Sequence, residues 1–178
     1  GTGKTTVSLN LARAAGKVEL LDCDVEEPNS HIFLKPESVK EERIGIEYPE
    51  IDRQKCTNCG DCAHFCRFNA FISSPSLTLT MPELCHSCGG CELVCKEKAI
   101  SYKIRETGSI LRGVSHNLSL SWGLLDVGEL SGVRIIEKLR STKASVPMRI
   151  TDCPPGTSCS TVEAVEGCDF ALIVAEPT

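Results

Sequence analysis

Two runs of cysteine carry the clearest chemical signal in the sequence. Each run has the spacing C-x2-C-x2-C-x3-C, and the second run repeats the first further along the chain. The members are Cys56, Cys59, Cys62 and Cys66 in the first run and Cys85, Cys88, Cys91 and Cys95 in the second. Three closely spaced thiolates can each reach one iron of a four-iron cube, while a fourth comes from elsewhere in the chain. The spacing therefore predicts two [4Fe–4S] clusters.

Zinc and disulfides are the alternatives to iron. Structural zinc usually takes cysteines in C-x2-C pairs, so two pairs would bind one zinc ion and leave the other cysteines of each run unused. Disulfide frameworks suit short secreted chains, and twelve cysteines in 178 residues fall below the roughly 8–10% that marks them. His64 and His86 lie among the cysteines, and we expect both at the surface because eight thiolates already suffice. The spacing favours iron–sulfur over both alternatives.

The two runs form an internal duplication that resembles the two-cluster ferredoxins. Gly60 and Gly89 occupy matching places, each directly after the second cysteine of its run. In such ferredoxins the fourth cysteine of each run binds the other cluster. The resemblance implies one cluster held by Cys56, Cys59, Cys62 and Cys95, and a second held by Cys85, Cys88, Cys91 and Cys66. The chain departs from that family at Arg67 and Lys96, where a proline is common.

Three other segments carry residues suited to the phosphates of a nucleotide. The first opens a predicted helix and would cradle phosphates with its backbone N–H groups; it consists of Gly1, Thr2, Gly3, Lys4, Thr5 and Thr6. Within it, Lys4 would reach the β- and γ-phosphates, and the Thr5 hydroxyl would bind Mg²⁺. The second segment ends a buried strand with the carboxylates of Asp22 and Asp24. The third supplies Asp152 for Mg²⁺ and Gly156, whose N–H can approach a γ-phosphate.

Together these segments resemble the MinD/ParA/nitrogenase-iron-protein family of P-loop ATPases, and more closely its MinD-type members with an inserted ferredoxin domain. The resemblance implies a homodimer that binds ATP or ADP with Mg²⁺, and catalytic roles for Lys4, Asp24 and Asp152. Asp24 would orient the attacking water, and Asp152 would serve the metal. Pro177 falls in a segment that, in that family, lies near the bound base. The family's first strand and signature lysine lie before Gly1, so we expect the chain to be a fragment of a longer protein.

Predicted helices and strands alternate along the chain. Helices are predicted at 5–15, 130–139 and 161–166, and strands at 18–21, 148–151 and 170–175, with a strand or hairpin at 118–122. This alternation predicts an α/β fold with a parallel sheet, as in P-loop NTPases, interrupted by a small α+β ferredoxin-like domain. We place the ATPase domain at residues 1–48 and 105–178 and the inserted domain at 49–104.

The composition narrows the classes of partner. Hydrophobic residues make up 41% and charged residues 24% of the chain, as in globular proteins. The sequence contains no run of about 18 apolar residues, so we expect no membrane span within it. A net charge of −5 without a basic–aromatic pattern argues against nucleic acid. We expect a cytoplasmic homodimer that exchanges electrons with a redox partner protein.

Three functions from different classes fit these signals. The first is an ATPase that couples nucleotide binding or hydrolysis to electron transfer through the clusters, and it is our preferred interpretation. The second is a carrier or assembly ATPase for which a cluster is cargo, although a full set of four internal thiolates favours retention of each cluster. The third is a MinD/ParA-like positioning ATPase with structural clusters, which would need a membrane helix or a DNA-binding surface.

Overall fold

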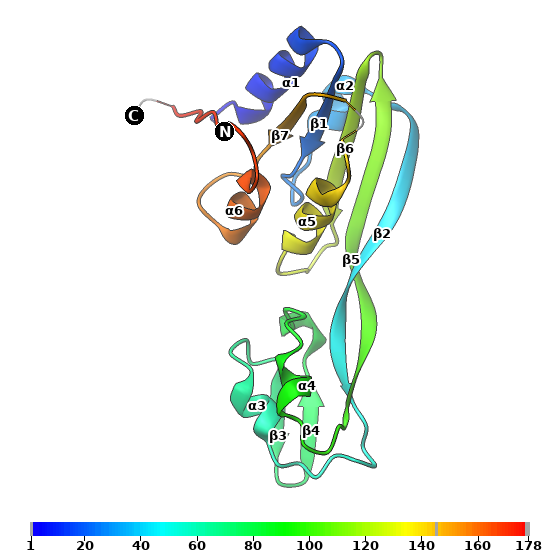
Figure 1. Ribbon diagram of the computed structural model, residues 1–178, viewed down its shortest axis with the longest axis vertical. Helices are drawn as coiled ribbons and strands as arrows, with labels where there is room; N and C mark the ends of the chain where they lie inside the picture. Colours follow the sequence, from blue (N-terminus) through cyan, green and yellow to red (C-terminus); the bar gives the residue numbers. More distant parts are fainter. Residues whose placement is uncertain (1, 145, 177–178) are drawn as a thin grey trace. The chain divides into compact units, whose positions relative to one another are not determined.

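The computed structural model describes residues 2–144 and 146–176 of the chain. It separates into two compact units (Figure 1). The larger unit combines residues 1–44 with 107–178, and the smaller unit is the continuous stretch 45–106. Two long strands, β2 (Glu37–Ile51) and β5 (Ile100–Ser115), carry the chain from one unit into the other.

A five-stranded sheet forms the centre of the larger unit, in the order β2-β5-β6-β1-β7. β1 (Val18–Asp22) pairs in parallel with β6 (Leu118–Leu125) on one side and with β7 (Arg149–Asp152) on the other. β5 and β6 form an antiparallel hairpin, whose turn includes His116 at a φ of 53°. The parallel core confirms the predicted α/β class, and three of the four predicted strands are present.

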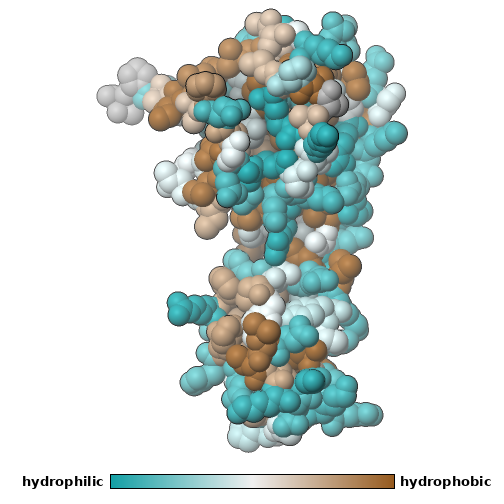
Figure 2. Space-filling view, viewed as in Figure 1, coloured by the Kyte–Doolittle hydropathy of each residue, from teal (hydrophilic) through white to brown (hydrophobic). Residues whose placement is uncertain are grey.

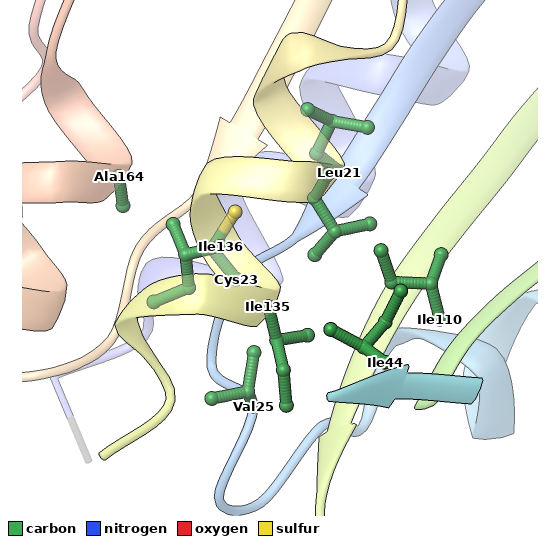
Figure 3. Packing of buried hydrophobic residues seen from close by; sticks show 9 residues of the cluster. Leu21, Cys23, Val25, Ile44, Ile110, Ile135, Ile136 and Ala164 are labelled. Carbon is green, nitrogen blue, oxygen red and sulfur yellow. The ribbon is translucent and has the colours of Figure 1, made fainter. Parts of the chain in front are cut away.

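Helices cover both faces of this sheet: α1 (Lys4–Ala15), α2 (Ser30–Leu34), α5 (Val133–Ser141) and α6 (Cys159–Val165). Because neighbouring residues of a strand point to opposite faces, Leu20 packs with α1 while Leu21 packs with α5. Figure 3 shows the α5 side, where Ile135 meets Val25 and the pair Ile44 and Ile110. Within the described ranges, no helix is long and apolar enough to cross a membrane.

Two sequence-based predictions are wrong. Residues 170–175 form no strand, and Phe170 is 94% and Ile173 is 87% exposed. Apolar side chains suit a strand only where a neighbouring strand offers hydrogen bonds, and β7 ends the sheet within the described residues. The apolar stripe of α5 also begins later than predicted. Leu130 precedes the helix and is 70% exposed, whereas Ile135, Ile136 and Leu139 are buried.

The smaller unit is a compact α+β body. It contains α3 (Asp61–Phe65), the hairpin of β3 (Phe71–Ser74) and β4 (Leu77–Thr80), a 3-10 helix η1 (Pro82–Leu84) and α4 (Gly90–Val94). α3 packs against α4. A Cβ on Gly90 would lie 2.1 Å from the Phe65 ring, so this contact needs glycine. Figure 2 shows hydrophobic surface over α3 and α4, where Phe65 and Leu93 are exposed.

Candidate nucleotide and cysteine sites

The duplication in the sequence is repeated in the backbone around the cysteines. The short helices α3 and α4 begin at matching places in the two runs, and each follows a glycine with positive φ, 82° at Gly60 and 76° at Gly89. Two more matching pairs have left-handed backbone, namely Asn58 with Ser87 and Asn69 with Lys98. Such conformations are uncommon for residues other than glycine and concentrate at functional sites. Both cysteine runs therefore adopt one loop conformation.

The eight sulfurs of the two runs divide between two cavities. The first cavity, of about 20 Å³, is lined by Cys56, Cys59, Cys62 and Cys95. The second, of about 500 Å³, is lined by Cys66, Cys85, Cys88 and Cys91. Each cavity thus takes three cysteines from one run and the fourth from the other run. We call these groups the first and second cysteine sets.

The pKa values of the thiols reflect the same division. Burial raises the pKa of Cys62, and the nearby thiols of Cys56 and Cys59 add to the rise. Burial also raises the pKa of Cys85, with further contributions from Cys88 and from Cys66 of the other run. A buried thiol with a raised pKa stays protonated until a cation binds the sulfur.

Backbone N–H groups point at several of these sulfurs. Ala70 donates to Cys66 Sγ at 3.4 Å, and its counterpart Ala99 donates to Cys95 Sγ at 3.3 Å. All twelve cysteines are free thiols. Over residues 2–144 and 146–176, no three His, Cys, Asp or Glu side chains are grouped to hold a single metal ion. His64 and His86 are exposed as predicted, and His86 stacks on Phe68.

Asp152 is the most constrained acid of the nucleotide end. It ends β7 and is 1% exposed. Oδ1 accepts a hydrogen bond from Ser8 Oγ at 3.0 Å, whereas Oδ2 is buried and has no hydrogen-bond partner within the described structure. Burial raises the pKa of Asp152, whereas the hydroxyls of Thr5 and Ser8 and the positive charge of Lys4 lower it. A buried carboxylate oxygen without a donor suits a hard cation.

Asp22 and Asp24 take different roles although they are close neighbours in the sequence. Asp22 is fully buried and accepts hydrogen bonds from the backbone N–H groups of Asp24, Asn29 and Ser30, at 3.0 to 3.2 Å. It therefore fixes the loop that follows β1. Asp24 is only half-buried, and burial together with the charges of Asp22 and Asp152 raises its pKa to about 6. Lys4 lowers this pKa, so Asp24 lies close to the lysine.

The structure thus brings Lys4, Thr5, Asp24 and Asp152 together at one end of the sheet. Gly3 precedes α1 with a φ of 88°, and Thr2 and Thr6 are exposed beside it. Gly156 lies in the exposed loop after β7. Gly1 and Pro177 lie outside the described residues. The sequence did not predict the contact of Ser8 with Asp152. The feature that could have predicted it is a hydroxyl on the buried face of the first predicted helix.

The comparisons with known proteins agree with this arrangement. A family model described as the CobQ/CobB/MinD/ParA nucleotide binding domain matches residues 1–153. The chain belongs to this family and carries its nucleotide-binding domain.

The relatives found by sequence carry less functional information. Two uncharacterized proteins of Methanocaldococcus jannaschii match the whole chain at 36% and 30% identity, and the chain spans 64% and 66% of their lengths. The ferredoxin-type protein NapH of Haemophilus influenzae is 38% identical over 66 residues, which cover 34% of this chain and 23% of that protein.

The raised pKa of Asp24 generates a prediction for stability. Because the folded state binds this proton more tightly than the unfolded state, the protein loses stability as the pH rises from about 4 through about 6. Asp24→Asn should therefore raise the free energy of unfolding at pH 8 by about 1 kcal/mol, after allowance for solvent screening at a half-buried site. The gain should vanish near pH 4.

Urea unfolding without nucleotide or metal, followed by fluorescence, measures this effect. Trp122, the one tryptophan of the chain, lies in β6 opposite Asp22 and reports on the larger unit. Glu27→Gln is the control, since Glu27 is exposed in the same loop and is not among the groups that shift the pKa of Asp24. An equal change at pH 4 and pH 8 would contradict the assigned cause.

Proposed function

We propose that the protein is an ATP-binding iron–sulfur protein, a MinD-type ATPase that couples nucleotide binding and hydrolysis to electron transfer through two [4Fe–4S] clusters. One observation carries the proposal. Within a nucleotide-binding domain lies a separate unit in which eight cysteine sulfurs line two cavities, four to each. We also propose that it acts as a homodimer with a redox partner protein.

The cysteine sets fit four-iron clusters in number, arrangement and environment. A [4Fe–4S] cluster takes four thiolates, and in a duplicated run the fourth comes from the other run. Cys66 and Cys95 line the cavities accordingly. The backbone N–H groups of Ala70 and Ala99 would stabilise thiolate charge on these two sulfurs. When bound, such clusters supply one-electron redox chemistry.

The nucleotide end supports Mg-ATP. Lys4 would bind the β- and γ-phosphates, and backbone N–H groups at the start of α1 would face the phosphates. Thr5 and the unpartnered Oδ2 of Asp152 would hold Mg²⁺. Asp24 would orient water toward the γ-phosphate, and its placement near Lys4 and Asp152 supports that role.

A continuous series of contacts leads from the loop after Asp24 to the two strands that connect the units. The Val25 carbonyl accepts a hydrogen bond from Leu125 N at 2.8 Å, at the end of β6. The next residue, Asp126, donates its N–H to the Thr107 carbonyl at 2.9 Å. Its carboxylate binds both terminal nitrogens of Arg43, at 3.1 and 2.5 Å.

Asp126 thus contacts both connecting strands at the residues where they leave the larger unit. Arg43 lies in β2 and Thr107 in β5. A nucleotide that shifts the loop after Asp24 would move Leu125 and Asp126, and with them the two strands that lead to residues 45–106. We assign the coupling to this route.

The cluster assignment predicts the composition of the protein. Anaerobically purified protein should contain about eight irons and eight sulfides per chain. Cys66→Ala should damage the cluster of Cys85, Cys88 and Cys91 and leave the other cluster intact, as resolved by electron paramagnetic resonance (EPR). Cys168→Ala, an exposed cysteine outside both sets, is the control. Stoichiometric zinc without iron would refute the proposal.

The nucleotide assignment predicts separate effects on binding and hydrolysis. Lys4→Ala should weaken ATP binding about 30-fold or more, because loss of a charged partner typically costs about 2 kcal/mol or more. Asp24→Ala should preserve binding and slow hydrolysis. Lys17→Ala removes an exposed lysine just after α1 and should change neither. Isothermal titration and phosphate release measure the two quantities, and wild-type affinity in Lys4→Ala would exclude the P-loop assignment.

The coupling route predicts that Asp126→Asn weakens communication without weakening the fold. If ATP affinity differs about tenfold between oxidised and reduced protein, a coupling of about 1.4 kcal/mol, the variant should lose most of that difference. An exposed ion pair contributes only about 0–1 kcal/mol to folding, so stability should change little.

Glu137→Gln is the matched control for Asp126→Asn. It breaks the exposed Arg134–Glu137 pair of α5, which lies within one helix and outside the proposed route. Equal coupling in Asp126→Asn and wild type would remove Asp126 from the route.

A further inference from the structure

Tyr102, near the start of β5, places its hydroxyl beside a sulfur of the second cysteine set. The hydroxyl oxygen lies 3.6 Å from Cys91 Sγ and donates to the Gly89 carbonyl at 3.2 Å. A phenol hydroxyl can both donate and accept hydrogen bonds, so Tyr102 can donate to this sulfur.

The internal duplication offers a comparison within the same unit. Ser73 stands after the first run at the place that Tyr102 holds after the second. Its hydroxyl shares a hydrogen bond with Thr78 Oγ1 at 3.0 Å. The Ser73 hydroxyl is thus engaged with Thr78, whereas the Tyr102 hydroxyl lies beside Cys91 of the second set.

A positive charge adds to the same difference. The guanidinium of Arg105 donates to the Pro82 carbonyl at 3.5 Å, three residues before Cys85, the first cysteine of the second run. Ser76 holds the matching position after the first run, so the first run has no cation at this place.

We propose that Tyr102, assisted by Arg105, makes the second cysteine set the site of higher reduction potential, where the transferred electron comes to rest. This inference depends on the proposed function. A metal-bound Cys91 sulfur carries no proton, so the Tyr102 hydroxyl is the donor, and an anionic sulfur competes for it with the Gly89 carbonyl.

Hydrogen bonds and positive charge at cluster sulfurs favour the reduced state, which holds one more negative charge, and so raise the potential. The matching positions of the first set carry serines in place of both groups. With clusters bound, Tyr102 and Arg105 would therefore favour the electron on the second set over the first.

Redox titration of the anaerobic protein with dithionite and mediators, followed by EPR, tests the inference. Tyr102→Phe should lower the midpoint potential of the second set by about 59 mV or more, a tenfold change in a one-electron equilibrium, and leave the first unchanged. Cys59→Ser identifies the signal of the first set. Tyr48→Phe, at the one other tyrosine of the chain, is the control.

Iron content separates this inference from the proposed function. Protein that binds no iron overturns both. Protein that binds eight irons but shows the same two potentials in wild type and Tyr102→Phe overturns only the role of Tyr102, as does an equal shift of both potentials. Arg105→Gln should lower the same potential as Tyr102→Phe, and it decides the matter if Tyr102→Phe loses iron.

Discussion

The nucleotide end of the molecule depends on two buried carboxylates. Asp22 and Asp152 stand opposite each other on the parallel strands β1 and β7, at 0% and 1% exposure. Burial of an unpaired carboxylate is costly, so each needs partners. Asp22 accepts hydrogen bonds from three backbone N–H groups, and these bonds fix the loop that carries Asp24. Asp152 has Ser8 on one oxygen and, among the described residues, no donor on the other, which leaves that oxygen for a cation.

The smaller unit has to hold eight thiols in two sets. It does so with the same loop conformation in both cysteine runs, with positive φ at matching residues. Backbone symmetry does not extend to the surroundings, because Tyr102 and Arg105 have serine counterparts after the first run. One scaffold thus provides two sulfur sites of different electrostatic character. β5 carries Tyr102 in one unit and Thr107 in the other, so the strand that touches Asp126 also holds the residue assigned to tune the second set.

Sequence patterns predicted those features of the fold and the site that depend on neighbouring residues in the chain. The apolar runs at 18–21 and 118–122 predicted the correct strands. Such runs form buried strands regardless of which strand pairs with them. The apolar run at 170–175 failed because a strand also needs a hydrogen-bonding neighbour, which no local pattern reveals. The role of Asp22 was equally hidden. Neighbouring acids look alike in sequence, and only the path of residues 24–30 shows that Asp22 binds the backbone while Asp24 lies near Lys4.

The proposed coupling requires that the bound nucleotide changes the reduction potential of a cluster held by the cysteine sets. The most direct test measures the midpoint potentials of the wild-type protein with no nucleotide, with Mg-ADP and with Mg-ATP. A coupling of roughly 1.4 kcal/mol would displace at least one potential by about 59 mV between the ATP and nucleotide-free states. Linkage then requires the oxidised and reduced proteins to differ tenfold in ATP affinity. Identical potentials in all three states would leave an iron–sulfur unit merely tethered to a nucleotide-binding domain.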